Sequence, residues 1–230
     1  MRPFAPRRSA LAVLAAGAIA SSVVSTRNLL SGQALKAREV IPKAWDAPPR
    51  ADGVYLPHGG PVQRWQRDVP FDVHLMVFGD STATGYGSAD AEEVPGARLS
   101  RGLSALSGKR IRLSTKAIVG ATSKGLSGQV DAMFVAGPPP DAAVIMIGAN
   151  DVTLLNGIPQ SARRLGDAVK RLRASGAVVV VGTCPDFGVI TAIPQPLRWV
   201  TRNRGLRLAR AQARAGGAAG WLGPTLGGAR

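Results

Sequence analysis

The sequence predicts an α/β fold, a three-layer α/β/α domain built on a parallel sheet. Short apolar runs alternate with stretches of helical periodicity over residues 71–213. Most of these runs are continuously apolar, which is typical of strands buried on both faces. Each run ends in glycine and small polar residues, so we expect these groups to meet at the carboxyl edge of the sheet, where such folds bind ligands.

The amino terminus differs from the rest of the chain. Residues 1–8 contain three arginines and residues 9–24 are uncharged and apolar, a pattern typical of a signal peptide or signal anchor over residues 1–25. A buried N-terminal helix is the alternative, and the choice between cleavage and anchoring stays open. The pattern predicts export, with the protein secreted or anchored on the outer side of the cytoplasmic membrane.

Residues 26–70 are predicted to form an amphipathic helix followed by a linker. Apolar residues recur at near-helical spacing between Asn28 and Val40, which indicates a short helix lying on a membrane surface or packed on the domain. The stretch from Pro42 to Pro70 is rich in proline and glycine and has little periodicity, so it is predicted to be a linker or wrapping segment.

The predicted catalytic domain spans residues 71–213. Its expected strands are residues 74–78, 111–119, 142–147 and 177–181, and its expected helices are residues 96–106, 125–134, 161–174 and 206–213. Residues 214–230 are dominated by glycine and alanine and are predicted to be an irregular tail. The sheet would then lack its last strand.

Four predicted strands end in glycine followed by small polar residues. The four ends are Gly79-Asp80-Ser81, Gly120-Ala-Thr122, Gly148-Ala-Asn150 and Gly182-Thr183. Any one of them is explained equally well as a turn or a helix cap. Their convergence on one edge indicates a functional site.

Three of these ends resemble the conserved blocks of the SGNH, or GDSL-type, hydrolases. Phe78-Gly-Asp-Ser-Thr-Ala-Thr-Gly85 resembles the first block, Gly120 stands where the second block has its glycine, and Gly148-Ala-Asn-Asp151 is similar to the third. The resemblance runs from about residue 74 to residue 213. It implies a flavodoxin-like three-layer fold and hydrolysis of acyl or acetyl esters without a metal or cofactor.

The same resemblance implies a role for each matching residue. Ser81 matches the nucleophile that forms the acyl-enzyme, and the backbone N–H groups of Ser81 and Gly120 with the Asn150 side-chain amide match the oxyanion hole. Asp80 and Asp151 are interpreted as structural partners. This arrangement suits acyl transfer, which needs two or three donors aimed at the tetrahedral oxyanion.

The sequence departs from the family where the catalytic base is expected. The family ends in Asp-x-x-His, but this chain has no histidine after His74 and no acidic residue after Asp186. His74 opens the strand that leads to Ser81, which places it about 20 Å away. His58 lies in the predicted linker, and it would serve as the base only if that segment folded over the edge that carries Ser81. No histidine matches the base, which therefore stays unknown.

Three explanations of the missing base stay open. The chain is a truncated or frame-shifted product, a non-catalytic surface-attached pseudoenzyme that binds esters or polysaccharides, or an enzyme whose base comes from another chain. A phosphate-binding α/β protein is a weaker alternative because the glycine-rich phosphate motifs are absent. Cys184 is predicted to be a small buried hydrophobe rather than a nucleophile.

Composition limits the partners. The net charge is +15, but the basic residues are scattered and lack interleaved aromatics, which disfavours specific nucleic-acid binding. Weak attraction to a membrane surface or an anionic cell-envelope polymer is more plausible. The expected substrate is a small-molecule, lipid or glycan ester. One cysteine and two histidines allow neither an intrachain disulfide nor a recognisable metal site.

Overall fold

The computed structural model describes residues 24–36, 39, 47–135 and 137–221. Contacts divide the chain into two units. The smaller unit holds residues 1–42 and 188–200, and the larger unit holds residues 43–187 and 201–230. The whole sheet belongs to the larger unit, as do all the site residues predicted from the sequence.

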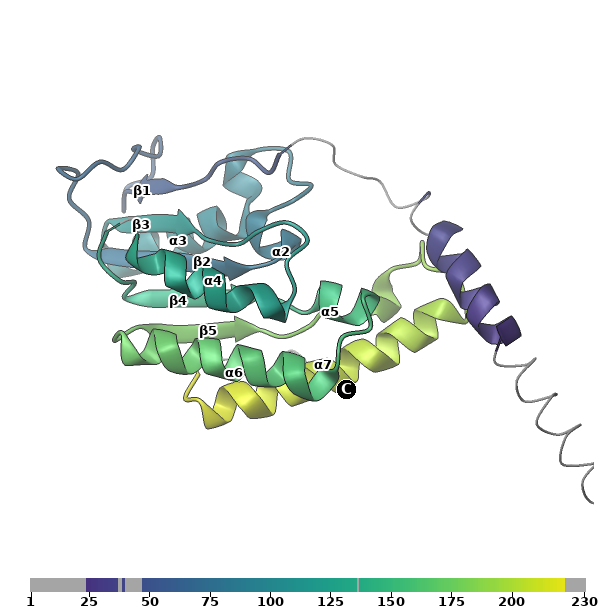
Figure 1. Cartoon of the computed structure of the whole chain (residues 1–230). Helices are drawn as coiled ribbons and strands as arrows, with labels where there is room; N and C mark the ends of the chain where they lie inside the picture. Colours follow the sequence, from purple (N-terminus) through teal and green to yellow (C-terminus); the bar gives the residue numbers. More distant parts are fainter. Residues whose placement is uncertain (1–23, 37–38, 40–46, 136, 222–230) are drawn as a thin grey trace, which may run out of the picture. The chain divides into compact units, whose positions relative to one another are not determined.

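The larger unit is built on a five-stranded sheet in the order β1-β3-β2-β4-β5. The strands are β1 (Gly53–Tyr55), β2 (Val73–Gly79), β3 (Ile111–Thr115), β4 (Ala142–Met146) and β5 (Val178–Gly182). The last four run parallel, and β1 pairs antiparallel with β3 (Figure 1). The α/β class and the parallel sheet are therefore confirmed. Within the described residues no strand lies beyond β5.

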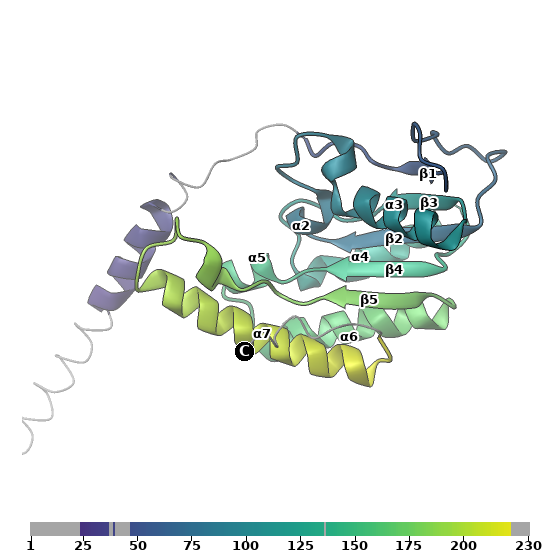
Figure 2. The same ribbon diagram turned by 180° about the vertical axis from the view of Figure 1, so that it is seen from behind.

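Helices cover both faces of this sheet. The helices that follow β1 are α2 (Ser81–Thr84), α3 (Pro95–Ser107), α4 (Leu126–Asp131), α5 (Ala149–Thr153), α6 (Ile158–Ala174) and α7 (Leu197–Ala218), of which α2 and α5 are short and stand at the ends of β2 and β4. One face carries α3, and the other carries α4 and α6 (Figures 1 and 2). β2 lies at the centre, where Met76 and Phe78 enter the core under α4 and α6 while Leu75 and Val77 enter the core under α3.

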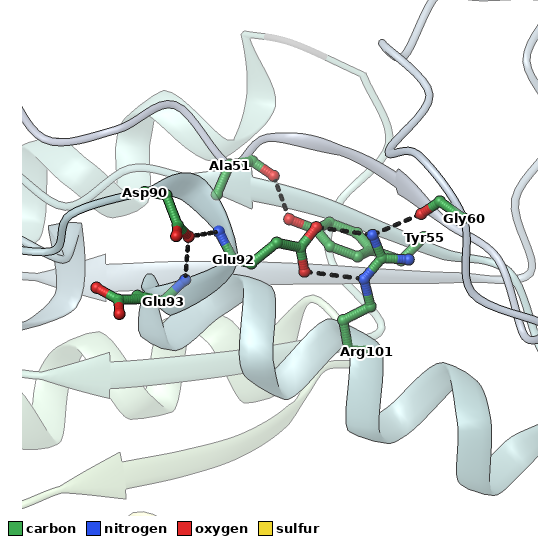
Figure 3. A network of polar contacts seen from close by, with 7 residues as sticks. All are labelled: Ala51, Tyr55, Gly60, Asp90, Glu92, Glu93 and Arg101. Atoms are coloured by element: carbon green, nitrogen blue, oxygen red, sulfur yellow. Dashed lines mark hydrogen bonds and ion pairs between the residues drawn. The ribbon is translucent and has the colours of Figure 1, made fainter.

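The segment expected to be a linker contributes a strand to the domain. Tyr55, the last residue of β1, is fully buried and donates a hydrogen bond to the Ala51 carbonyl over 2.6 Å. Arg101 of α3 lies over the Tyr55 ring, pairs with Glu92 and donates to the Gly60 carbonyl (Figure 3). The prediction of a linker or wrapping segment did not include this strand, because a three-residue strand is too short to leave a periodic pattern.

The end of the chain is more regular than predicted. Residues 214–218 continue α7, and Trp221 packs against the core under α4 and α6. The indole ring lies against Gly216, where an added Cβ would approach it to 3.1 Å. Gly216 therefore suits this position of the helix because its missing side chain leaves room for the Trp221 ring. The predicted irregular tail is wrong for residues 214–218, and residues 222–230 lie outside the described part of the chain.

The described part of the smaller unit contains a helix over residues 24–36. Gln33 of this helix donates to the Gln195 carbonyl, and its side-chain oxygen accepts a hydrogen bond from the Leu197 N–H over 3.0 Å. Leu29 and Leu35 are 52% and 61% exposed. No helix in the described ranges is long and apolar enough to cross a membrane. The predicted signal segment lies outside the described residues up to residue 23.

Candidate active site

β2 delivers Ser81 to the carboxyl edge of the sheet. The strand ends at Gly79 with φ +138°, where an added Cβ would lie 1.9 Å from the Met146 carbonyl oxygen, so only glycine fits. Asp80 caps α2 and accepts a hydrogen bond from the Thr82 N–H over 3.0 Å. Ser81 follows and is half-buried. Neither its N–H nor its hydroxyl has a hydrogen-bond partner among the described residues.

The buried side chain of Gln129 on α4 fixes this turn through two hydrogen bonds. The Gln129 side-chain oxygen accepts the Gly79 N–H and its amide nitrogen donates to the Gly79 carbonyl, both over 2.8 Å. Both backbone groups of the residue that turns the chain toward Ser81 are thereby satisfied. The sequence interpretation missed Gln129. Its signal was a polar residue beside Val130 on the buried face of a short helix.

Asp80 ties the first block to the third. Its carboxylate also accepts the Gly148 N–H over 3.2 Å, and the Asp80 N–H donates to the Met146 carbonyl over 3.0 Å. Burial raises the pKa of Asp80, and the N–H donors oppose that shift. With both oxygens engaged by backbone donors, Asp80 has the structural role that the sequence indicated.

The loop after β3 brings Gly120 to the same edge. The Lys116 N–H donates to the Val77 carbonyl over 2.8 Å and the Ile118 N–H donates to the Gly79 carbonyl over 3.1 Å, so the loop continues alongside β2. Gly120 then adopts φ +81° in an exposed turn, a conformation that favours glycine. Its N–H makes no hydrogen bond to any described residue.

Asn150 stands on α5 against this loop. Its amide nitrogen donates one hydrogen bond to the Ala121 carbonyl over 2.9 Å, which leaves its second N–H without a partner in the described ranges. The structure therefore brings Ser81, Gly120 and Asn150 together through the contacts of their immediate neighbours. Three polar N–H donors and one hydroxyl remain available at this edge.

Asp151 locks the loops on either side of Asn150. This carboxylate is 1% exposed. It accepts four hydrogen bonds of 2.8 to 3.0 Å, from the Ser123 N–H and hydroxyl, the Asn156 amide and the Ser161 hydroxyl. One side chain thus fixes the Gly120 loop, α5 and the start of α6, in agreement with the structural role that we predicted.

Cys184 lies at the same edge but is buried. Burial, with the charges of Asp80 and Asp151 as weaker causes, raises the pKa of its thiol to about 12. Gln212 of α7 is fully buried beside it, accepts the Cys184 N–H over 2.8 Å and donates to the Ile147 carbonyl over 2.9 Å. A protonated, enclosed thiol is a packing group, as expected from the sequence.

Both histidines of the chain lie at the opposite edge of the sheet. His74 starts the buried part of β2, where its Nε2 lies 2.9 Å from the Ser114 hydroxyl and its Nδ1 lies 3.1 Å from the Pro138 carbonyl oxygen. Burial, and then the charge of Arg112, lower the pKa of His74 to about 4. His58 is exposed and follows β1 by three residues. The last residue of β1, Tyr55, pairs with the first residue of β3, so the chain leaves β1 at the amino end of the parallel strands. Neither imidazole is on the Ser81 edge.

The edge around Ser81 therefore has acyl-transfer donors and a hydroxyl but no histidine. Cation ligands are scarce as well: within the described ranges, no three or more His, Cys, Asp or Glu side chains are placed to hold a metal ion. The chemistry that the arrangement offers is attack by the hydroxyl on a carbonyl whose developing oxyanion meets the N–H donors.

Comparisons with known proteins agree with this chemistry. Residues 77–222 match the model of the GDSL-like lipase/acylhydrolase family. The chain is 71% identical over 225 residues to the GDSL-like esterase Rv1075c of Mycobacterium tuberculosis, a match that covers 96% of this chain and 72% of that protein.

Solved structures share the fold at low identity. The SGNH-hydrolase family esterase AlinE4 is 17% identical with a TM-score of 0.55, and the match covers 70% of this chain and 79% of that one. A catalytic mutant of Axe2, an acetylxylan esterase from Geobacillus stearothermophilus, is 20% identical with a TM-score of 0.52 over 67% and 76% of the two chains. Motif, fold and sequence identity agree, and the chain belongs to the GDSL-like lipase/acylhydrolase family of serine ester hydrolases.

Proposed function

We propose that Ser81 is the nucleophile of this esterase and that Gly120 and Asn150 complete its oxyanion hole. One observation carries the proposal: the Ser81 N–H and hydroxyl, the Gly120 N–H and one Asn150 N–H are unpartnered among the described residues at a single edge of the sheet. Polar groups in folded proteins are normally paired, so a convergent set of free donors favours a ligand oxygen as their partner.

The reaction begins with a bond from Ser81 Oγ to the acyl carbonyl carbon. The carbonyl oxygen becomes an oxyanion that the three N–H groups stabilise, and the bond to the alcohol oxygen then breaks to leave acyl-Ser81. The proton of the serine hydroxyl passes to the departing alcohol. Water then attacks the carbonyl carbon of acyl-Ser81, and the same N–H groups stabilise the second oxyanion. Its collapse releases the acid and returns a proton to the Ser81 oxygen.

Each attack needs a base, and this chain provides no imidazole near Ser81. His74 is held at the amino end of β2, and His58 follows the strand that runs the opposite way. We propose that the 230 residues alone turn over esters slowly and that the base of a fully active site comes from polypeptide outside them. Loss of a triad member leaves about 10³–10⁴-fold catalysis over water from the oxyanion hole and binding.

A second candidate function follows from the same observation. With a preformed set of donors and no base, the site can hold an ester without cleaving it, as a surface-attached ester- or polysaccharide-binding pseudoenzyme does. The two functions differ in whether Ser81 becomes acylated. A binder retains ligand affinity in the Ser81→Ala variant, whereas an esterase shows a covalent intermediate at that residue.

Covalent labelling tests the proposal. The chain is incubated with an alkyl fluorophosphonate, and the modified residue is identified by peptide mass spectrometry. We expect slow labelling of Ser81, no labelling of the Ser81→Ala variant, and unchanged labelling of Ser107→Ala, an exposed serine at the end of α3. Asn150→Ala should slow labelling by about 10²-fold. Labelling that persists in Ser81→Ala would refute the assignment.

We also propose that the protein acts outside the cytoplasm. The three arginines within residues 1–8 and the uncharged run that follows support export. The net charge of +15 supports weak association with an anionic membrane surface or envelope polymer. Fractionation of cells that express a tagged chain tests this, and a wholly cytoplasmic signal would contradict it.

A further inference from the structure

A cleft of about 870 Å³ opens beside the candidate active site. Its lining includes Thr84, whose hydroxyl donates to the Ser81 carbonyl over 2.9 Å, and Val119, which precedes Gly120 in the chain. From there it runs along β3 to Arg112, three residues before the strand ends, a distance of about 10 Å. The cleft thus leads away from the proposed reacting atoms toward the amino end of β3.

The end of the cleft nearest the site is apolar. Val94, Ile118 and Val119 line it, and the last two are 60% and 43% exposed respectively. Exposed β-branched side chains beside a reactive serine are suited to bury a short hydrocarbon segment of a ligand, which gains about 0.8 kcal/mol for each buried CH₂.

Cations line the rest of the cleft. Arg50, Arg64, Lys116 and Arg112 contribute to its wall, against one carboxylate, Asp52. Asp52 already accepts the Thr115 N–H over 2.9 Å. In the described part of the chain, Arg50, Arg64 and Lys116 make no side-chain hydrogen bond or ion pair, although other surface arginines of this protein pair with acids. Four cations and one carboxylate therefore line one concave place, which leaves an excess of positive charge there.

Two parts of the cleft wall are fixed by contacts within the domain. Arg112 is 3% exposed and its guanidinium lies 3.4 Å from the centre of the Trp65 ring, a close cation–π contact. The Trp65 indole N–H is buried and has no hydrogen-bond partner among the described residues. The segment before β1 is fixed by two hydrogen bonds: the Tyr55 hydroxyl donates to the Ala51 carbonyl, and the Thr115 N–H donates to the Asp52 carboxylate. The Arg112 guanidinium is therefore held in place before a ligand binds, whereas Arg50 and Arg64 are exposed side chains at the surface of the cleft.

We propose that this cleft binds an anionic group of the substrate, so that the esters the protein prefers carry a phosphate or carboxylate joined to the ester by a short hydrocarbon spacer. Arginine and lysine side chains and an indole N–H suit both oxygen anions, and guanidinium groups bind either one in a bidentate manner. The substrate class rests on the proposed function at Ser81, whereas anion binding in the cleft does not.

Calorimetric titration of the full chain tests the cleft directly. The probes are hexyl phosphate and heptanoate, with hexanol as the neutral reference. We expect at least one anion to bind more tightly than hexanol, and its affinity to fall as salt concentration rises. Arg64→Gln and Lys116→Gln should each weaken anion binding about fivefold, the scale of a partly exposed charge-assisted contact. Arg98→Gln, an exposed arginine on α3 outside the cleft, is the matched control and should bind as the parent does.

Outcomes for the cleft and for Ser81 are separable. If both anions bind no better than hexanol, or if Arg64→Gln and Lys116→Gln bind the preferred anion as the parent does, the cleft assignment is overturned even where Ser81 is labelled. If Ser81 is not labelled but the two variants weaken anion binding, the proposed function fails and the anion site stands. Circular dichroism of each variant confirms that its fold is retained.

Discussion

Replacement of Asp151 by asparagine should destabilise the protein by about 2–4 kcal/mol. The carboxylate is 1% exposed and accepts four hydrogen bonds from three residues. Asparagine retains one oxygen but places an NH₂ group against at least one of these donors. A buried donor without an acceptor costs about 1–3 kcal/mol, and the remaining bonds lose the extra strength of a charged acceptor.

Urea denaturation followed by far-ultraviolet circular dichroism measures this loss. Asp68→Asn is the matched control because Asp68 is exposed and its side chain makes no hydrogen bond or ion pair among the described residues, so the free energy of unfolding of this variant should stay within about 0.5 kcal/mol of the parent. A loss below about 0.5 kcal/mol in Asp151→Asn would refute the role that the geometry gives to this carboxylate. Since the same carboxylate fixes the Gly120 loop, Ser81 labelling should slow in parallel.

Three further predictions concern the scaffold around the site. The pKa of His74 is lowered from 6.5 to about 4, so the folded state favours the neutral ring. About 3 kcal/mol of stability that is present above pH 6.5 should therefore be lost as the pH falls toward 4. The difference in urea midpoint between the parent and His74→Gln, followed across this pH range, measures the loss. Gly79→Ala should abolish folding because its Cβ would lie 1.9 Å from a carbonyl oxygen, whereas Gly128→Ala, in open space on α4, should fold normally; soluble yield and circular dichroism separate the two. Gln212→Leu should cost about 2–4 kcal/mol in urea unfolding because two buried backbone groups lose their partner, and an unchanged midpoint would contradict this.

The parallel strands could be predicted because burial on both faces leaves a continuous apolar signal. Neighbouring residues such as Leu75 and Met76 are both apolar because they enter the cores on opposite faces of the sheet. The glycines near the strand ends mark the carboxyl edge. The edge location of Ser81 and Asn150 follows from that alternation of strands and helices. Gly120 reaches the same edge through a loop, because the strand predicted over residues 111–119 ends at Thr115.

Other features left too little signal in the sequence. β1 is three residues long, and its place is set by the tertiary contacts of Tyr55 with Arg101 rather than by local pattern. α7 continues through glycines because Trp221 covers them, a contact that no local propensity reveals. Gln129 and Gln212 satisfy backbone groups far away in the chain, and such long-range partners cannot be read from spacing.

The most direct test of the central claim is hydrolysis of p-nitrophenyl butyrate at neutral pH by the full chain and its Ser81→Ala variant, each with and without added imidazole. We predict slow turnover that depends on Ser81 and that rises with imidazole concentration above the Ser81→Ala background, because a free base supplies what the edge lacks. Equal rates in both proteins at every imidazole concentration would show that Ser81 is not the nucleophile. Fast turnover without imidazole would show that the described chain contains a base that its geometry does not reveal.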